Sequence, residues 1–179
     1  DDGQGDPELA LPARRVNNPA AGLAHWFAPM AASFARTSEL ASPFGETLAR
    51  SALTLDSHHW GARLMLAKDY QSYSRYDEAL ALLGSKKDMP PVARLLRAEI
   101  LLEKGEVAAA MAEADLAIAG SDVPRDLLIS HTDFVRKMKD PAKSKQALER
   151  LLAHLTGRGD DPQLQALILV SLADLRLKS

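Results

Sequence analysis

The strongest constraint on the fold is a repeat with a period of 31 residues in an alanine- and leucine-rich chain. Residues 64–83, LMLAKDYQSYSRYDEALALL, align at that constant offset with residues 95–114, LLRAEILLEKGEVAAAMAEA. The matching positions are Ala67 and Ala98, Tyr70 and Leu101, Ser74 and Gly105, Tyr76 and Val107, and Ala79 and Ala110. This pattern is typical of a helix-turn-helix unit, with small residues where two helices cross, large ones between them, and Gly or Ser at the turn.

Helical signals continue through the rest of the chain, and strand signals are nearly absent. Residues 1–18 mix glycine, proline and charge without a period, which predicts a disordered tail or linker. A helix is predicted from Pro19, with a kink or break before Pro29. The further helices are predicted over 42–55, 60–73, 76–83, 91–104, 107–119, 124–139, 141–155 and 162–177.

Large apolar residues in the first two helices are predicted to face a core. In the first helix these are Trp26, Phe27, Met30 and Phe34. In the second, steps of three and four residues mark one buried face, which consists of Phe44, Leu48, Ala52 and Leu55.

Composition narrows the class of function. The chain of 179 residues has a formal net charge of -2, which leaves no basic surplus to neutralise phosphates and disfavours nucleic acid as the main ligand. It has no cysteine, which excludes disulfides, thiolate metal sites and a cysteine nucleophile. Charged residues interrupt the apolar runs, so we predict no membrane-spanning helix. One helical domain is expected over 19–179.

The segment 55–80, LDSHHWGARLMLAKDYQSYSRYDEAL, resembles a tetratricopeptide repeat (TPR). In that family Asp and usually Pro open the unit, Leu, a small residue and Tyr mark the first helix, and Gly-x-Tyr-Asp-Glu-Ala opens the second. Here those slots hold Asp56, Ser57, Leu66, Ala67, Tyr70, Ser74, Tyr76, Asp77, Glu78 and Ala79. The departures are Ser57 for Pro, Ser74 for Gly, and Arg63 for an aromatic residue of the first helix. The second unit keeps Ala98, Leu101, Gly105 and Ala110.

The resemblance implies an all-α fold, a right-handed α-solenoid of antiparallel helix pairs that forms a TPR-like superhelix. It implies repeats over 57–90 and 91–121, divergent pairs over 19–56 and 124–156, and a closing helix over 162–177. Repeats that bury an apolar face only on their neighbours need about three units and a terminal cap, and this count satisfies that requirement.

The same resemblance implies that a partner protein or peptide segment binds the concave surface lined by the first helices. In the first repeat, the residues on the other side of the helix from its core positions are Met65, Lys68, Gln71 and Ser72. The matching set in the second repeat is Leu96, Glu99, Leu102 and Glu103. Exposed Met and Leu with charges of both signs would suit an amphipathic segment. The alternative interpretation for part of this set is plain solvated helix surface.

Catalysis and metal binding find little support in the sequence. His58 and His59 are adjacent, so on a helix their side chains diverge by about 100° and cannot hold a metal as an i, i+4 pair can. A helix start explains them better. Asp77 and Glu78 are likewise interpreted as a helix start, where they complement the helix dipole. No glycine-rich phosphate loop or nucleophile elbow is present. We therefore expect a non-enzymatic protein with no cofactor and no metal.

The expected function is a protein-protein interaction scaffold. Among the bacterial uses of the TPR family, envelope assembly, secretion and exopolysaccharide export are the favoured settings. The absent cysteine, the missing initial methionine and the linker-like start favour the bacterial periplasm, with the cytoplasm next. The alternative is that the chain is the regulatory or substrate-presenting arm of a larger enzyme, such as a glycosyltransferase. Neither the partner nor the oligomeric state can be deduced from the sequence.

Overall fold

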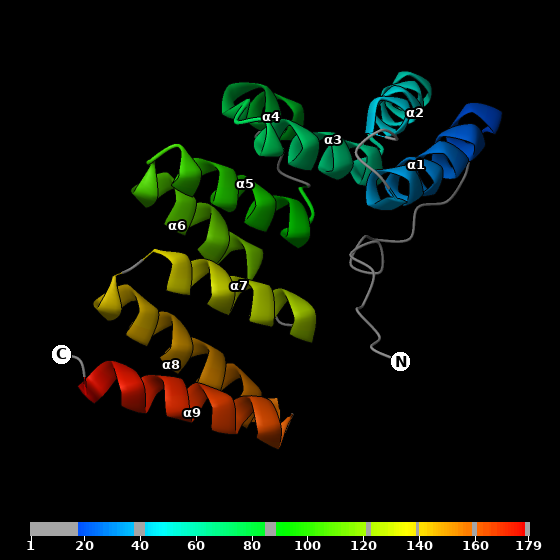
Figure 1. Cartoon of the computed structure of the whole chain (residues 1–179). Helices are drawn as coiled ribbons and strands as arrows, with labels where there is room; N and C mark the ends of the chain where they lie inside the picture. Colours follow the sequence, from blue (N-terminus) through cyan, green and yellow to red (C-terminus); the bar gives the residue numbers. More distant parts are fainter. Residues whose placement is uncertain are drawn as a thin grey trace. The chain divides into compact units, whose positions relative to one another are not determined.

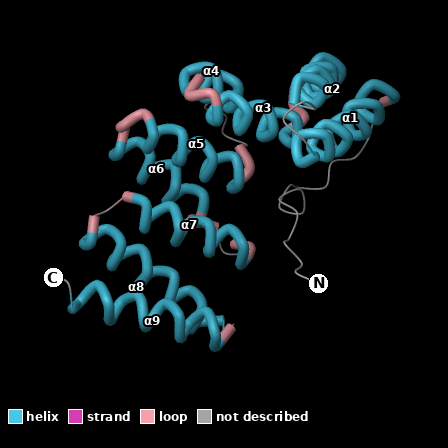
Figure 2. Tube along the Cα trace, viewed as in Figure 1, coloured by secondary structure: helices cyan, strands magenta, loops and turns pink. Residues whose placement is uncertain are grey.

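The computed structural model describes residues 18–37, 42–84, 89–120, 123–138, 140–158 and 161–177. In these ranges the chain forms nine α-helices and no strand (Figures 1 and 2), so the predicted all-α class is confirmed. The helices are α1 (Pro19–Thr37), α2 (Ser42–Leu55), α3 (Trp60–Ser72), α4 (Tyr76–Leu83), α5 (Pro91–Glu103), α6 (Val107–Ala117), α7 (Arg125–Lys137), α8 (Pro141–Arg158) and α9 (Pro162–Leu177).

The ends of the helices agree with the predicted ends to within a few residues. Pro29 lies inside α1 and does not divide it. The tail predicted over 1–18 lies outside the described residues except for Asn18. The Asn18 Oδ1 atom accepts a hydrogen bond of 2.8 Å from the Ala21 N–H, so Asn18 caps α1 rather than belonging to the tail.

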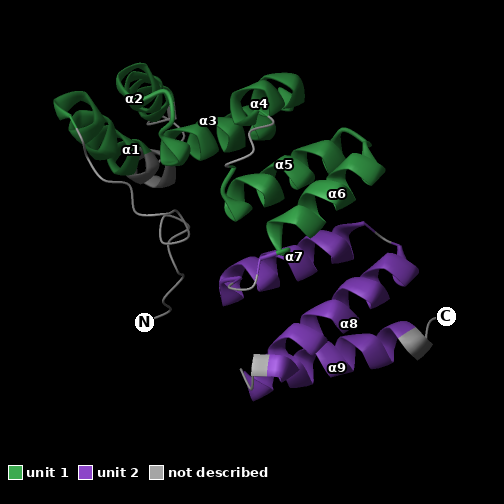
Figure 3. Ribbon diagram, turned by 180° about the vertical axis from the view of Figure 1, so that it is seen from behind, with its two compact units in different colours: residues 1–119 green, residues 120–179 purple. Residues whose placement is uncertain are grey.

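The chain divides into two compact units, residues 1–119 and 120–179 (Figure 3). In the first unit, α1 packs on α2, α3 on α4, and α5 on α6, and successive pairs meet through α2 with α3 and α4 with α5. In the second unit, α8 packs on both α7 and α9. This packing of neighbours is consistent with a helical repeat. The single domain over 19–179 stays a prediction.

Alanine dominates the core between the first two helix pairs. One cluster joins Leu66 of α3 to alanines that have no exposed surface, which are Ala24, Ala31, Ala49, Ala52 and Ala62. A second cluster, between α3, α4 and α5, contains larger side chains such as Leu83 and Ile100. Small side chains allow helices to approach closely, and the large ones fill the remaining space.

The predicted core faces of α1 and α2 are partly wrong. Trp26 is 70% exposed, Met30 39% and Phe44 51%, whereas Phe27 packs against the alanine-rich cluster. The reason is that alanine at steps of four and three, Ala24, Ala28 and Ala31, occupies the buried side of α1. Of the α2 face, Ala52 is buried and Leu48 and Leu55 are partly buried. The Phe34 side chain lies outside what the structure describes.

The two repeats predicted from the sequence end their first helices in the same way. Ser74 and Gly105 both have positive φ, 57° and 87°. The Ser74 N–H donates to the Gln71 carbonyl at 2.9 Å and the Arg75 N–H to the Tyr70 carbonyl at 2.8 Å. At the second turn Gly105 donates to Leu102 at 3.0 Å and Glu106 to Leu101 at 2.8 Å. Both turns are therefore Schellman motifs, 31 residues apart.

Equivalent arginines also link the first helix to the second helix in each of these two repeats. The Arg63 Nη1 atom donates to the Leu82 carbonyl of α4, and the Arg94 Nη1 atom to Glu113 Oε2 of α6 at 3.1 Å. Each arginine reaches a residue 19 positions further along the chain. Arg63 stands where the TPR pattern has an aromatic residue, and it supplies a polar link between the helices of the pair instead.

Substitutions in the two turns test whether they share this conformation. Gly105→Ala should lower the free energy of unfolding by about 1 kcal/mol, because an L-residue with positive φ is strained, while the added Cβ would meet no atom within 4 Å. Ser74→Gly should raise it by about 0.5–1 kcal/mol, because glycine relieves that strain. Urea unfolding followed by circular dichroism measures both changes.

Gly120→Ala is the matched control, since its Cβ also meets no atom within 4 Å and its φ is not positive. We expect it to be neutral or slightly stabilising. The shared turn geometry would be wrong if Gly105→Ala cost no more than Gly120→Ala.

Candidate functional site

The first helices of the two repeats lie next to each other, and a polar contact joins them. The Gln71 Nε2 atom on α3 donates a hydrogen bond of 2.8 Å to Glu103 Oε1 on α5. This bond brings together one predicted contact residue from each repeat. We call the surface around it the α3–α5 face, which comprises Lys68, Gln71, Ser72, Glu99, Leu102 and Glu103.

Two of the eight predicted contact residues belong to packing rather than to this face. Leu96 is 3% exposed and lies in the core cluster with Leu64 and Leu83, so the expectation that it is exposed is wrong. Met65, at the equivalent position of α3, is half-buried against the alanine-rich cluster. Both residues point toward the preceding helix pair. The sequence assigned them to the free surface because the contact between successive pairs was not visible in the pattern of one helix.

The remaining predicted residues differ in how freely they can meet a partner. Lys68, Ser72 and Glu103 are exposed, and Gln71, Glu99 and Leu102 are half-buried. The Ser72 hydroxyl donates to the Asp69 carbonyl at 2.7 Å, so it is engaged with its own helix. Lys68 makes no ion pair within the described residues. The face therefore offers one exposed cation, two carboxylates and one half-buried leucine.

A charged cluster that the sequence did not predict surrounds Tyr70, next to this face. The Arg75 guanidinium lies 4.4 Å from the centre of the Tyr70 ring, and Arg50 donates a hydrogen bond to the Tyr70 hydroxyl. Glu46 neutralises Arg50, and Glu78 neutralises Arg75. The hydrogen bond from Arg75 lowers the pKa of the Glu78 carboxyl. Tyr70 is 7% exposed and has its hydroxyl satisfied, so it packs rather than reacts.

The turn that ends α5 carries a further ion-pair network. The Lys104 Nζ atom lies 2.8 Å from Asp77 Oδ1 and 3.0 Å from Glu106 Oε1. These hydrogen bonds, that to Asp77 first, raise the pKa of the Lys104 ammonium. Asp77 and Glu78 both lie in the first turn of α4, as predicted, and each has a cationic partner. Through its ion pair with Lys104, Asp77 therefore links α4 to the end of α5.

The histidine pair has the structural role that the sequence favoured. The His59 Nδ1 atom accepts a hydrogen bond of 3.2 Å from the Ala62 N–H and so caps α3. His58 contacts Ser57 instead, at 3.2 Å. Across the described residues, no group of three or more His, Cys, Asp or Glu side chains could hold a metal ion.

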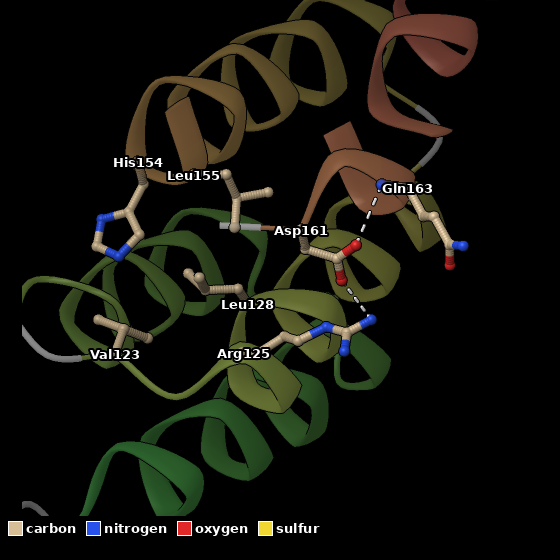
Figure 4. Close-up of a pocket in the computed structure, with 7 residues that line it drawn as sticks. All are labelled: Val123, Arg125, Leu128, His154, Leu155, Asp161 and Gln163. Carbon is tan, nitrogen blue, oxygen red and sulfur yellow. Dashed lines mark hydrogen bonds and ion pairs between the residues drawn. The ribbon is translucent and has the colours of Figure 1, made fainter. Parts of the chain in front are cut away.

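The second unit contains a pocket of about 380 Å³ between α7, α8 and the start of α9 (Figure 4). Val123, Leu128 and Leu155 form its apolar part. Its polar residues are Arg125, His154, Asp161 and Gln163. His154 lies on the opposite side of the pocket from Asp161 (Figure 4), so the two do not form an acid–base pair.

Asp161 makes two structural contacts in the wall of the pocket. Its Oδ1 atom accepts hydrogen bonds from the N–H groups of Gln163 at 3.2 Å and Leu164 at 3.1 Å, which caps α9. Its Oδ2 atom forms an ion pair of 2.5 Å with Arg125 on α7. Among the described residues that line the pocket, Asp161 is the one carboxylate, and it is already used twice, so this arrangement is structural.

Asp161 allows these two roles to be separated. Asp161→Ala should lower the free energy of unfolding by about 2 kcal/mol, because it removes the cap and places alanine at a φ of 45°. Asp161→Asn keeps the capping oxygen and tolerates positive φ, so it should cost less than about 1 kcal/mol, the usual value of a partly exposed ion pair. Thermal unfolding of both variants measures the difference.

Asp133→Ala is the control, because Asp133 forms an exposed ion pair in the same unit without capping a helix. Its effect should stay within about 0.5 kcal/mol. Equal losses for the Ala and Asn variants at position 161 would contradict the capping role.

Comparisons with known proteins do not place the chain in a family, since no family model, no curated protein and no solved structure matches it. The resemblance to tetratricopeptide repeats therefore stays a prediction. The helices described in the structure include none with the length and hydrophobicity needed to cross a bilayer. This agrees with the sequence prediction on membrane spans.

Proposed function

We propose that the chain is an interaction scaffold whose α3–α5 face binds a segment of a partner protein. The observation that carries the proposal is the hydrogen bond between Gln71 and Glu103. It places equivalent faces of two successive first helices side by side, so a segment lying across them would meet side chains from both repeats. A right-handed TPR-like solenoid, with this face on its concave side, is the arrangement that we propose for the whole chain.

The chemistry of the face favours an amphipathic partner segment. Lys68 and Glu103 supply charges of opposite sign, and half-buried Leu102 supplies an apolar contact. Helical repeats offer no sheet edge, so the partner would not bind by adding a strand. Recognition would instead combine charge complementarity, which sets partner choice, with burial of apolar side chains.

The cellular setting that we propose is a bacterial envelope assembly, secretion or exopolysaccharide export machine, in the periplasm. This part of the proposal is supported by the sequence alone, through the absence of cysteine and the bacterial uses of the family that residues 55–80 resemble. A non-enzymatic role is supported by the site chemistry, because the Tyr70 hydroxyl and, in the pocket of the second unit, Arg125 and Asp161 are engaged in structural contacts.

Charge reversal on the α3–α5 face tests the proposal. The wild-type chain is first used to recover its partner from a native extract, and the affinity of the recovered segment is then measured by fluorescence anisotropy. Lys68→Glu and Glu99→Lys should each weaken binding by about tenfold, because each turns an attraction into a repulsion. The loss should shrink as ionic strength rises.

Lys145→Glu and Glu149→Lys on α8 are the matched controls, since both side chains are about half exposed and lie in the second unit. They should leave the affinity unchanged. Unchanged binding by the Lys68 and Glu99 variants, with helicity retained in circular dichroism, would remove the α3–α5 face from the binding site.

A further inference from the structure

Exposed apolar side chains gather on the first and last helices. Among the described residues, six of the ten large hydrophobic side chains that are exposed lie on α1 or α9. On α1 they are Leu23, Trp26 and Met30, at 51%, 70% and 39% exposure. On α9 they are Leu167, Leu169 and Val170, at 62%, 54% and 66%. We call these two sets the α1 stripe and the α9 stripe.

Each stripe lies away from the side of its helix that is buried within its own unit. The α1 stripe, with steps of three and four residues, is opposite Ala24, Ala28 and Ala31. The α9 stripe is exposed while Ile168 and Leu172 of the same helix are buried. Both helices are therefore apolar on the buried side and on the open side.

Most of each helix lacks the charges that a water-facing surface normally has. The sequence holds no Asp, Glu, Lys or Arg from position 19 to 35, nor from 162 to 173. A helix that is apolar on all sides is normally buried, and the end units of helical-repeat proteins normally have a polar outer face. A protein surface is a cover that fits both stripes.

We propose that the two stripes cover each other, the α9 stripe of one copy of the chain packing on the α1 stripe of a second copy. The surfaces that carry the two stripes differ in shape, because small residues lie beside the α9 stripe. The α1 stripe presents large side chains, including Trp26 and Met30. On α9, Val170 is flanked at steps of four and three by exposed Ala166 and Ala173, which leave room for large residues.

This difference in shape favours a head-to-tail contact over a symmetric one. Two α1 stripes would set Trp26 and Met30 against bulky residues, whereas the exposed alanines beside Val170 leave room for them. A head-to-tail contact also continues the mode by which neighbouring helices pack within each unit. Because one α1 stripe and one α9 stripe remain open at the ends of such a pair, further copies can add.

The first test is the mass of the 179-residue chain in solution. Sedimentation equilibrium of the wild type, from about 10 µM to about 1 mM, should show a mass that rises beyond that of the monomer, as expected for a small interface. Trp26→Glu and Val170→Glu should each be monomeric over this range, because each buries a charge in the contact. Leu116→Glu, which changes a leucine on α6 that is 54% exposed, should associate like the wild type.

Mixing the two blocked variants tests the head-to-tail geometry itself. Trp26→Glu keeps an intact α9 stripe, and Val170→Glu keeps an intact α1 stripe. An equal mixture should therefore form a dimer with one copy of each and no larger species, although each variant alone is monomeric. A symmetric contact predicts the opposite, since one of the two variants would dimerise alone and mixing would add nothing.

Disulfide trapping gives a second readout, because the chain has no cysteine of its own. Trp26→Cys and Val170→Cys, mixed and oxidised under dilute conditions, should yield the mixed disulfide well above either homodimer. Circular dichroism verifies that every variant remains helical. A wild type that is monomeric at all concentrations would overturn the proposal, whether or not it binds lipid vesicles, and so would trapping of homodimers alone.

Discussion

The close approach of helices on alanine is the constraint on which the rest of this structure depends. Alanines with no exposed surface recur on every helix from α1 to α6, among them Ala24, Ala49, Ala67, Ala98 and Ala110. Helices that meet through such side chains can pack at the short end of the usual interaxial distance of about 8–10 Å. Each alanine buries little apolar area, so one pair of helices gains little by itself. Stability must accumulate over successive pairs, as it does in repeat proteins.

Hydrogen bonds and ion pairs between helices supplement this alanine-rich core. The donor that recurs in them is the guanidinium group of arginine. Arg63 and Arg94 reach the second helix of their own pair. Arg97 donates to the Gly84 carbonyl at 2.7 Å, which joins the end of α4 to α5, and it shares Glu113 with Arg94. The side chains of Arg94, Arg97 and Glu113 are about 20% exposed, so their charges are paired where solvent screens them only partly. A long, forked donor spans the gap between two closely packed helices better than a branched apolar side chain can.

The sequence predicted those features that local chemistry decides. Helix ends and the two matching turns were predictable, because helix breakers and positive-φ positions act within a few residues of the chain. The exposure of Trp26 and the burial of Leu96 were not, because both depend on which neighbouring helix covers which side. In alanine-rich helices the usual rule, that large apolar residues mark the buried face, fails when alanine itself forms that face. The charged cluster around Tyr70 was also invisible, since Arg50 and Tyr70 meet only through the packing of α2 on α3.

The chain exposes two kinds of surface whose contacts respond oppositely to salt. On α1, alanine faces inward, and leucine, tryptophan and methionine are left on the outside. On α9, leucine and valine are exposed although Ile168 and Leu172 of the same helix are buried. The α3–α5 face instead carries Lys68 and Glu103 on exposed positions. Screening at high ionic strength weakens contacts through such charges, whereas salting-out ions strengthen the burial of apolar surface. Contacts made by the α3–α5 face and contacts made by the stripes can therefore operate on one chain without competing, because neither the residues nor the forces are shared.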